Sequence, residues 1–171
     1  QTSTSINIIK PKEEILSKNQ RVFINTPVLS GSINLKGAIL DDLELSNYKI
    51  SLDENSKNIE LFLPDGTSNP YYVEIGWKQI NETSIDLPNL ETEWESNSTT
   101  LSSNKDVILS WKNNQNITFK ITYEIDENYM FSIKQEIFNG SNKTIDVFPY
   151  RLIKRINTPD TINFFILHEG L

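Results

Sequence analysis

From Arg21 onward, apolar and polar residues alternate along most of this 171-residue chain. In the stretch YYVEIGW, for example, Tyr71, Val73 and Ile75 recur at every second position, which places them on one face of an extended strand. Similar runs follow one another with short turns between them and no helical pattern. The alternation predicts an all-β, antiparallel fold, with a sandwich favoured over a barrel because several runs are long.

The first part of the chain lacks this pattern. Residues 1–20 are mostly polar, although PKEEILSKN can form a short helix with a proline and two glutamates in its first turn. Residues 21–171 are long enough for one domain with its own core. The chain starts at Gln1, and its last apolar run, residues 162–167, ends without a turn. We therefore expect a sandwich domain that is part of a longer protein and truncated at its C-terminus.

Charge and composition exclude several classes of function. The formal net charge of −7 at pH 7 disfavours nucleic acid as a partner, because nucleic-acid binding needs a basic face. The chain contains no cysteine, so it has neither a disulfide framework nor a thiolate metal site. No apolar run approaches the length of about 18 residues that spans a bilayer. We therefore expect that this fragment itself does not cross a membrane.

Candidate catalytic and metal-binding residues are few. His168 is the only histidine, and we expect it to be a hydrogen-bonded structural residue rather than a catalytic base or a metal ligand. Asp41 and Asp42 are adjacent, so in a strand they should point to opposite faces, which disfavours a hydrolytic carboxylate pair. The sequence therefore predicts no metal, no cofactor and no enzymatic activity.

Aromatic residues provide the candidate binding positions. Trp77 and Trp111 end alternating runs and are expected to be largely buried. Trp94 lies in a long, strand-poor segment, residues 79–105, of a kind that usually holds or wraps a partner. Three aromatic residues are candidates for a functional role, either as part of a concave groove or as a contact with a partner. These candidates are Tyr71, Tyr72 and Trp94.

Acidic residues surround one of these candidates. Glu91, Glu93 and Glu95 alternate around Trp94. They could line a sugar site, but a solvated strand edge, where charge discourages aggregation, is the favoured interpretation.

Several blocks, in the same order, resemble YidC-type membrane protein insertases, especially those of alphaproteobacteria. The blocks include RVFINTPVLSGSINLKGAILDDLELSNY, LFLPDGTSNPYYVEIGW, FPYRLIKR and FFILHEGL, and the resemblance covers almost the whole chain after Arg21. It implies the N-terminal part of a periplasmic domain with an antiparallel β-supersandwich fold, similar to galactose mutarotase-like proteins. In that fold GSINLKGA and DDLEL would form a strand pair, with a bend or bulge at Gly37.

The resemblance also implies a function. The parent proteins insert and fold inner-membrane proteins, alone or with the Sec translocon. The partners expected through the full-length parent are therefore Sec translocon components and nascent inner-membrane proteins. This domain would act on the periplasmic side of the bacterial inner membrane in partner docking or client contact, with residues 78–106 as the candidate contact. The alternatives are a carbohydrate-binding or epimerase-like module on the same fold and a purely structural spacer.

Overall fold

Two β-sheets and one short helix make up the described part of the chain. The structure, a computed structural model, describes residues 9–79 and 85–157. Its elements are α1 (Lys12–Leu16), β1 (Arg21–Asn25), β2 (Leu29–Asn34), β3 (Ile39–Lys49), β4 (Asn58–Phe62), β5 (Tyr71–Gln79), β6 (Glu95–Ser96), β7 (Thr100–Leu101), β8 (Val107–Lys112), β9 (Ile117–Ile125), β10 (Phe131–Asn139) and β11 (Val147–Arg155). The predicted all-β class and the short helix in PKEEILSKN are confirmed. The run at residues 162–167 and His168 lie outside the described residues.

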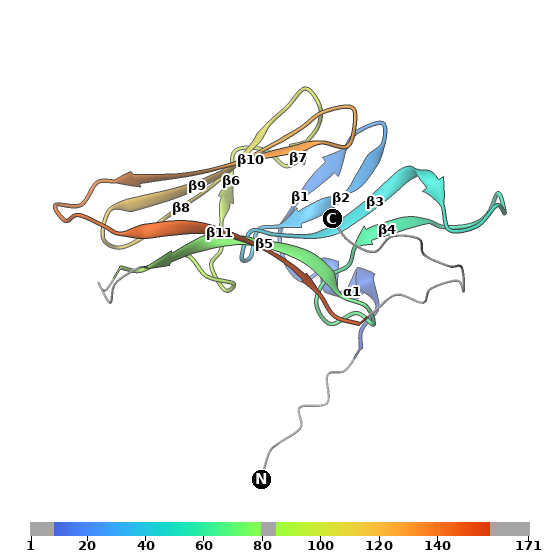
Figure 1. Cartoon of the computed structure of the whole chain (residues 1–171), viewed down its shortest axis with the longest axis horizontal. Coiled ribbons are helices and arrows are strands. Elements are labelled where there is room, and N and C mark those ends of the chain that lie inside the picture. Colours follow the sequence, from blue (N-terminus) through green and yellow to red (C-terminus); the bar gives the residue numbers. More distant parts are fainter. Residues whose placement is uncertain (1–8, 80–84, 158–171) are drawn as a thin grey trace, which may run out of the picture.

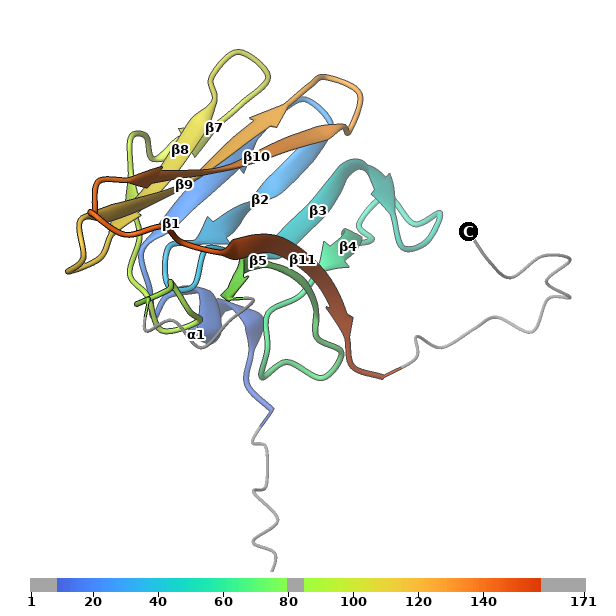
Figure 2. The same cartoon turned by 60° about the vertical axis from the view of Figure 1, so that its left-hand side comes forward.

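The strands form one sheet of seven and one of four (Figure 1). The large sheet has the order β11-β5-β3-β2-β1-β7, with β4 also paired to β3, and the small sheet has the order β10-β9-β8-β6. Neighbours run antiparallel, apart from the short parallel pair β1–β7. In Figure 2 the small sheet lies over β1 and β2, whereas β3 and β4 continue past it.

The core lies between the two sheets, as the alternation predicts. On β9, every second residue from Ile117 to Ile125 is buried. Trp77 is also buried, as expected, and its ring centroid lies 5.2 Å from that of Phe119 on β9. Trp111 is only partly buried, because it stands next to the last residue of β8 at the edge of the core. The prediction is thus correct for Trp77 and too strong for Trp111.

β2 and β3 form a hairpin, which is the strand pair expected from GSINLKGA and DDLEL. Gly37 lies in its turn with a φ of +78°, so the chain bends there as predicted. The β-bulge lies further along, because the register shifts between Ser32 and Ile33 and leaves Asp41 as the extra residue on β3.

This bulge corrects the expectation that Asp41 and Asp42 point to opposite faces. An extra residue interrupts the alternation of side chains, and both carboxylates are buried and are joined to each other through Ser32 and Arg21. Ser32 Oγ donates a hydrogen bond to Asp42 Oδ2 and accepts one from Arg21 Nε, each at 2.7 Å, and Arg21 Nη2 donates to Asp41 Oδ1. The bulge therefore brings two adjacent aspartates into one hydrogen-bonded network.

Replacing Gly37 by alanine is expected to cost about 2–3 kcal/mol of unfolding free energy, through backbone strain and a steric clash. A Cβ atom at this position would come within 2.8 Å of the Leu90 carbonyl oxygen. Gly66→Ala is the matched control, because Gly66 also has a positive φ but its Cβ would meet only Ile15 Cδ1, at 3.4 Å. The control should show the backbone cost alone, about 1–2 kcal/mol. Urea unfolding measures both, and equal losses would contradict the clash.

The last two strands, β10 and β11, lie in different sheets. β9 and β10 form an antiparallel pair in the small sheet, whereas β11 pairs with β5 in the large sheet and not with β10. The connection at residues 140–146 therefore carries the chain from one sheet to the other (Figure 1). Side chains bridge the two sheets here: Arg151 Nη2 on β11 donates to the Ile133 carbonyl on β10 at 2.7 Å, and Gln135 Nε2 on β10 donates to the Gly76 carbonyl on β5 at 2.9 Å. Alternation within a single strand does not reveal this change of sheet, because it does not show which strand will be its neighbour.

Candidate partner-contact site

Residues 85–101, called the strap below, pass the turn of the β2–β3 hairpin and continue into short pairs with β8 and β1. Their only strands are β6 and β7, of two residues each, so the segment is strand-poor as predicted. Backbone hydrogen bonds fix the strap: Gly37 N donates to the Thr92 carbonyl at 2.8 Å, and Trp94 N donates to the Leu35 carbonyl at 2.9 Å. The strap is therefore held on the sandwich by specific contacts.

Trp94 anchors the strap in the core. Its side chain is 5% exposed, and its ring stacks on that of Trp77 with centroids 6.2 Å apart and an interplanar angle of 23°. Its Nε1 is buried and has no hydrogen-bond partner among the described residues. This side chain is not on the surface, so a partner that approaches the strap meets the residues on either side of it.

The three aromatic candidates do not form one groove. Tyr71 and Tyr72 are consecutive on β5 and face opposite sides of the sheet. The ring of Tyr71 meets Phe62 and the guanidinium of Arg155, whereas that of Tyr72 is buried beneath the Lys154 amine. Trp94 packs at the other end of β5, on Trp77.

The exposed surface of the strap is an acidic ridge, made of Glu91, Glu93 and Glu95. All three side chains are exposed on either side of the buried Trp94. Lys36 Nζ contacts Glu91 Oε2 at 2.6 Å, and this hydrogen bond raises the pKa of Lys36 above its ordinary value. Leu90, next to the ridge, is 45% exposed. The ridge thus combines a fixed backbone, unburied charge and one apolar side chain.

A second charged cluster, missed in the sequence, joins α1 to the large sheet. Lys12 Nζ lies 2.8 Å from Asp42 Oδ1, 2.9 Å from Glu44 Oε1 and 3.0 Å from Glu60 Oε1. Burial lowers the pKa of Lys12, but the hydrogen bonds to these carboxylates outweigh it and hold the pKa above its ordinary value. The residues come from three separate elements, so no local motif could have indicated the cluster.

Lys12→Met is expected to lower the free energy of unfolding by about 2 kcal/mol, because it removes charged hydrogen bonds while keeping most of the side-chain volume. Lys10→Met is the matched control, since the ion pair of Lys10 in the described residues is with the exposed Glu14, four residues further on. Such surface pairs contribute little, so the control should lose less than about 0.5 kcal/mol. Equal losses in urea unfolding would show that the Lys12 contacts add nothing to stability.

The buried carboxylates are engaged by neighbouring residues. Burial raises the pKa of Asp41, and the charge and hydrogen bond of Arg21 act against that rise. Asp42 is bound by Ser32 and Lys12. Among residues 9–79 and 85–157, no three histidine, cysteine, aspartate or glutamate side chains are placed to hold a metal ion. The arrangement serves packing of the hairpin and of α1.

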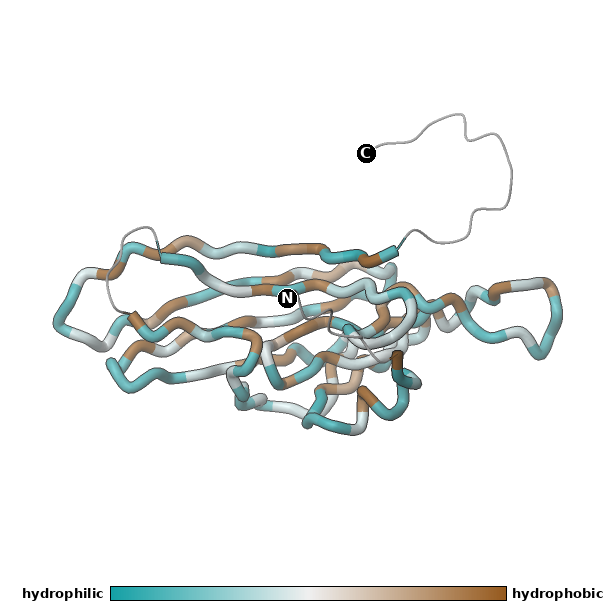
Figure 3. The backbone as a smooth tube through the Cα atoms, turned by 90° about the horizontal axis from the view of Figure 1, so that it is seen from below, coloured by the Kyte–Doolittle hydropathy of each residue, from teal (hydrophilic) through white to brown (hydrophobic). Residues whose placement is uncertain are grey.

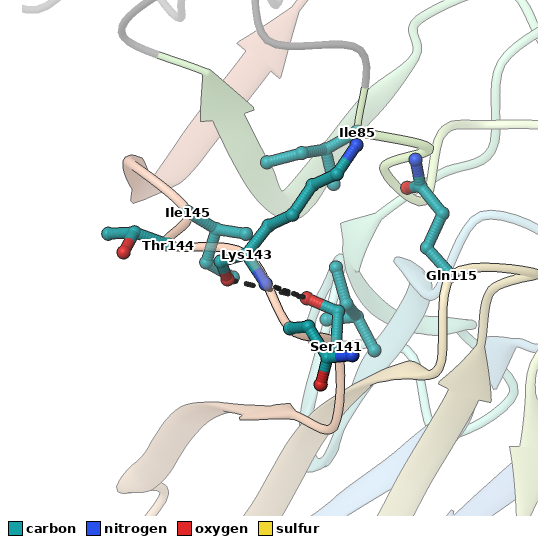
Figure 4. A pocket seen from close by; sticks show the side chains of 8 residues that line it. Ile85, Gln115, Ser141, Lys143, Thr144 and Ile145 are labelled. Carbon is teal, nitrogen blue, oxygen red and sulfur yellow. Dashed lines mark hydrogen bonds between the residues drawn. The ribbon is translucent and has the colours of Figure 1, made fainter.

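A cavity of about 420 Å³ lies at the end of the sandwich where the chain changes sheets (Figure 4). Ile85, Ile117 and Ile145 contribute apolar walls, and the side chain of Lys143 extends toward Ile85. Ser141 and Lys143 are already hydrogen-bonded to each other within the connection. The cavity therefore follows from the crossing of the chain between sheets and offers no converging set of catalytic groups.

The two sheets define an all-β sandwich domain. Its acidic ridge lies on a strap that backbone hydrogen bonds fix to the sandwich. In the described ranges, no helix has the length and hydrophobicity needed to cross a bilayer.

Comparison with known proteins gives the family. The family model described as "YidC periplasmic domain" matches residues 21–171. Curated relatives named "Membrane protein insertase YidC" include those of Rickettsia bellii, 44% identical over 90% of this chain and 27% of the relative, and Methylobacterium radiotolerans, 41% identical over 94% of this chain and 26% of the relative. The protein of Methylorubrum extorquens is 39% identical over the same shares, 94% and 26%. The chain belongs to the YidC periplasmic domain family, as the sequence blocks indicated, and spans about a quarter of the length of these relatives.

Proposed function

We propose that this chain is the N-terminal part of the periplasmic domain of a membrane protein insertase, on the periplasmic side of a bacterial inner membrane. Its role is accessory and not enzymatic: it makes contacts with partner proteins or clients of the full-length parent. The family match over residues 21–171 and the name shared by the relatives support this proposal. The parent's insertion of inner-membrane proteins, alone or with the Sec translocon, is part of the same proposal.

The contact surface is the acidic ridge of the strap together with Leu90. The observation that carries this assignment is the Trp94–Trp77 stack, with ring centroids 6.2 Å apart, because it fixes the backbone that carries the glutamates. A partner then binds a preorganised surface, which lowers the entropic cost of association. Negative charge favours a basic partner surface and speeds the encounter, while burial of Leu90 contributes to the lifetime of the complex.

Photo-crosslinking in the full-length parent tests the assignment. A photoreactive amino acid replaces Glu93 in one variant and Asn142, an exposed residue at the crossing between sheets, in the control. Adducts to Sec components or to nascent inner-membrane proteins are expected from position 93, and they should decrease in the Glu91→Lys/Glu95→Lys background. Adducts from position 142 alone, or from neither position, would remove the strap from the proposal.

A further inference from the structure

The inner face of the large sheet extends past the small sheet and leaves an apolar groove of about 450 Å³. Leu45, Leu61 and Phe62, on β3 and β4, form one side. Tyr129 and Phe131, at the turn into β10, form the other. The groove continues the core, since the partly buried Leu61, Phe62 and Phe131 pack against the buried cluster between the sheets. It is therefore a part of the core that lacks a cover among the described residues.

Exposed apolar side chains surround this groove. Tyr48 is 53% exposed and its ring lies 6.5 Å from that of Tyr129, while neighbouring Met130 is 64% exposed. The connection from β3 to β4 projects beside them and carries exposed Ile50 and Leu52 (Figure 3). Contiguous apolar surface of this kind marks a binding site.

The groove also adjoins a free strand edge. β10 is the last strand of the small sheet, and in the described ranges its only strand partner is β9. On its other side, side chains make the contacts: Arg151 donates to the Ile133 carbonyl and to the Gln135 side chain, and Gln135 donates to the Gly76 carbonyl. A free edge next to an apolar groove is suited to an added strand, because the edge supplies backbone hydrogen bonds and the groove receives alternate side chains.

The chain beyond the described residues supplies an occupant of matching chemistry. Five of the six residues in INFFIL, residues 162–167, are apolar. The described chain ends close to the groove: the Arg155 guanidinium lies 4.7 Å from the Tyr71 ring centroid, and the Tyr71 ring meets Phe62 with centroids 5.1 Å apart. The five residues that lead from position 157 to position 162 can span up to about 17 Å, which allows residue 162 to reach the groove.

We propose that residues 162–167 of this chain occupy the apolar groove, alongside the free edge of β10. The segment then covers Phe62, Phe131 and the side chains between them, and buries its own apolar residues in the same step.

A spin label in the segment tests the proposal. The chain has no cysteine, so Asn163→Cys provides a single site for a nitroxide on the full 171-residue protein. The label is expected to broaden the NMR signals of Leu61 and Phe131 selectively. The matched control, Asn142→Cys, lies at the opposite end of β10 and should leave those signals sharp. Sharp groove signals with the Asn163→Cys label, or equal broadening throughout the molecule, would overturn the proposal.

A mixing experiment distinguishes a segment that occupies the groove of its own chain from one that occupies the groove of a second copy. Spin-labelled protein without isotope label is added to isotope-labelled protein without a nitroxide. Sharp groove signals in the mixture support occupancy within one chain, whereas broadened ones would show that the segment comes from another copy and would overturn the proposal.

A second variant tests whether the apolar side chains of the segment cover the groove. Ile162→Ser/Phe164→Ser/Ile166→Ser changes residues outside the described sandwich, and it is expected to raise the fluorescence of an added naphthalene sulfonate dye several-fold. Unchanged dye fluorescence would contradict the proposal.

Discussion

Trp94→Ala is expected to lower the free energy of unfolding by about 3–5 kcal/mol, because it leaves a large cavity next to Trp77. The residue lies in a segment that has little regular structure, where an exposed side chain would cost less than about 0.5 kcal/mol. Urea unfolding followed by circular dichroism measures the loss. A loss below about 1 kcal/mol would show that the strap is not anchored by this side chain.

Trp94→Phe is the control for the indole nitrogen. Because Nε1 has no hydrogen-bond partner in the part of the chain that the structure describes, phenylalanine removes no described bond and leaves a smaller cavity, so its cost should be clearly below that of alanine. A phenylalanine variant as unstable as the alanine variant would indicate that the indole nitrogen has a partner, such as a buried water molecule.

Arg21→Met is expected to cost about 3–5 kcal/mol at pH 7, because it leaves the buried Asp41 carboxylate without its cation. Burial already raises the pKa of Asp41, and Arg21 acts against that rise. Without Arg21 the pKa of the folded state rises further above the ordinary value of 3.8. The folded variant then retains its proton to higher pH than the unfolded chain, so its stability falls as pH rises through this window.

The loss caused by Arg21→Met should therefore shrink as pH falls from 7 toward 4, where a protonated Asp41 no longer needs the guanidinium. Arg21→Met/Asp41→Asn is the matched control, since it removes the titrating group and should show little pH dependence of this kind. Unfolding curves at the two pH values provide the comparison. A single-variant loss that is the same at both would contradict the role of the buried charge.

Side-chain alternation predicts the fold where one face of a strand is buried. It placed Trp77 in the core correctly, and β9 shows the same period without interruption. It could not predict the bulge at Asp41, because an inserted residue is set by the pairing of two strands and not by either strand alone. The assignment of Asp41 and Asp42 to opposite faces was wrong for that reason.

The candidate site was predictable only in part. The strand-poor segment and its alternating glutamates stand out in the sequence, but the burial of Trp94 depends on contacts with Leu35 and Trp77, which lie far away in the chain. The Lys12 cluster has the same character, since its carboxylates come from β3 and β4. Long-range contacts of this kind leave no local period in the sequence.

The pairing of β11 with β5 means that the large sheet can be completed only after β11 has been synthesised. Trp77 is opposite Pro149 in this pair, so a large loop must close before the contact forms, and loop closure of this length slows folding. A chain synthesised from its N-terminus has β5 available well before β11. During that interval β5 presents an unpaired edge, and an unpaired edge can pair with another molecule. The arrival of β11 therefore both completes the large sheet and closes the period in which the growing chain is most exposed to misassembly.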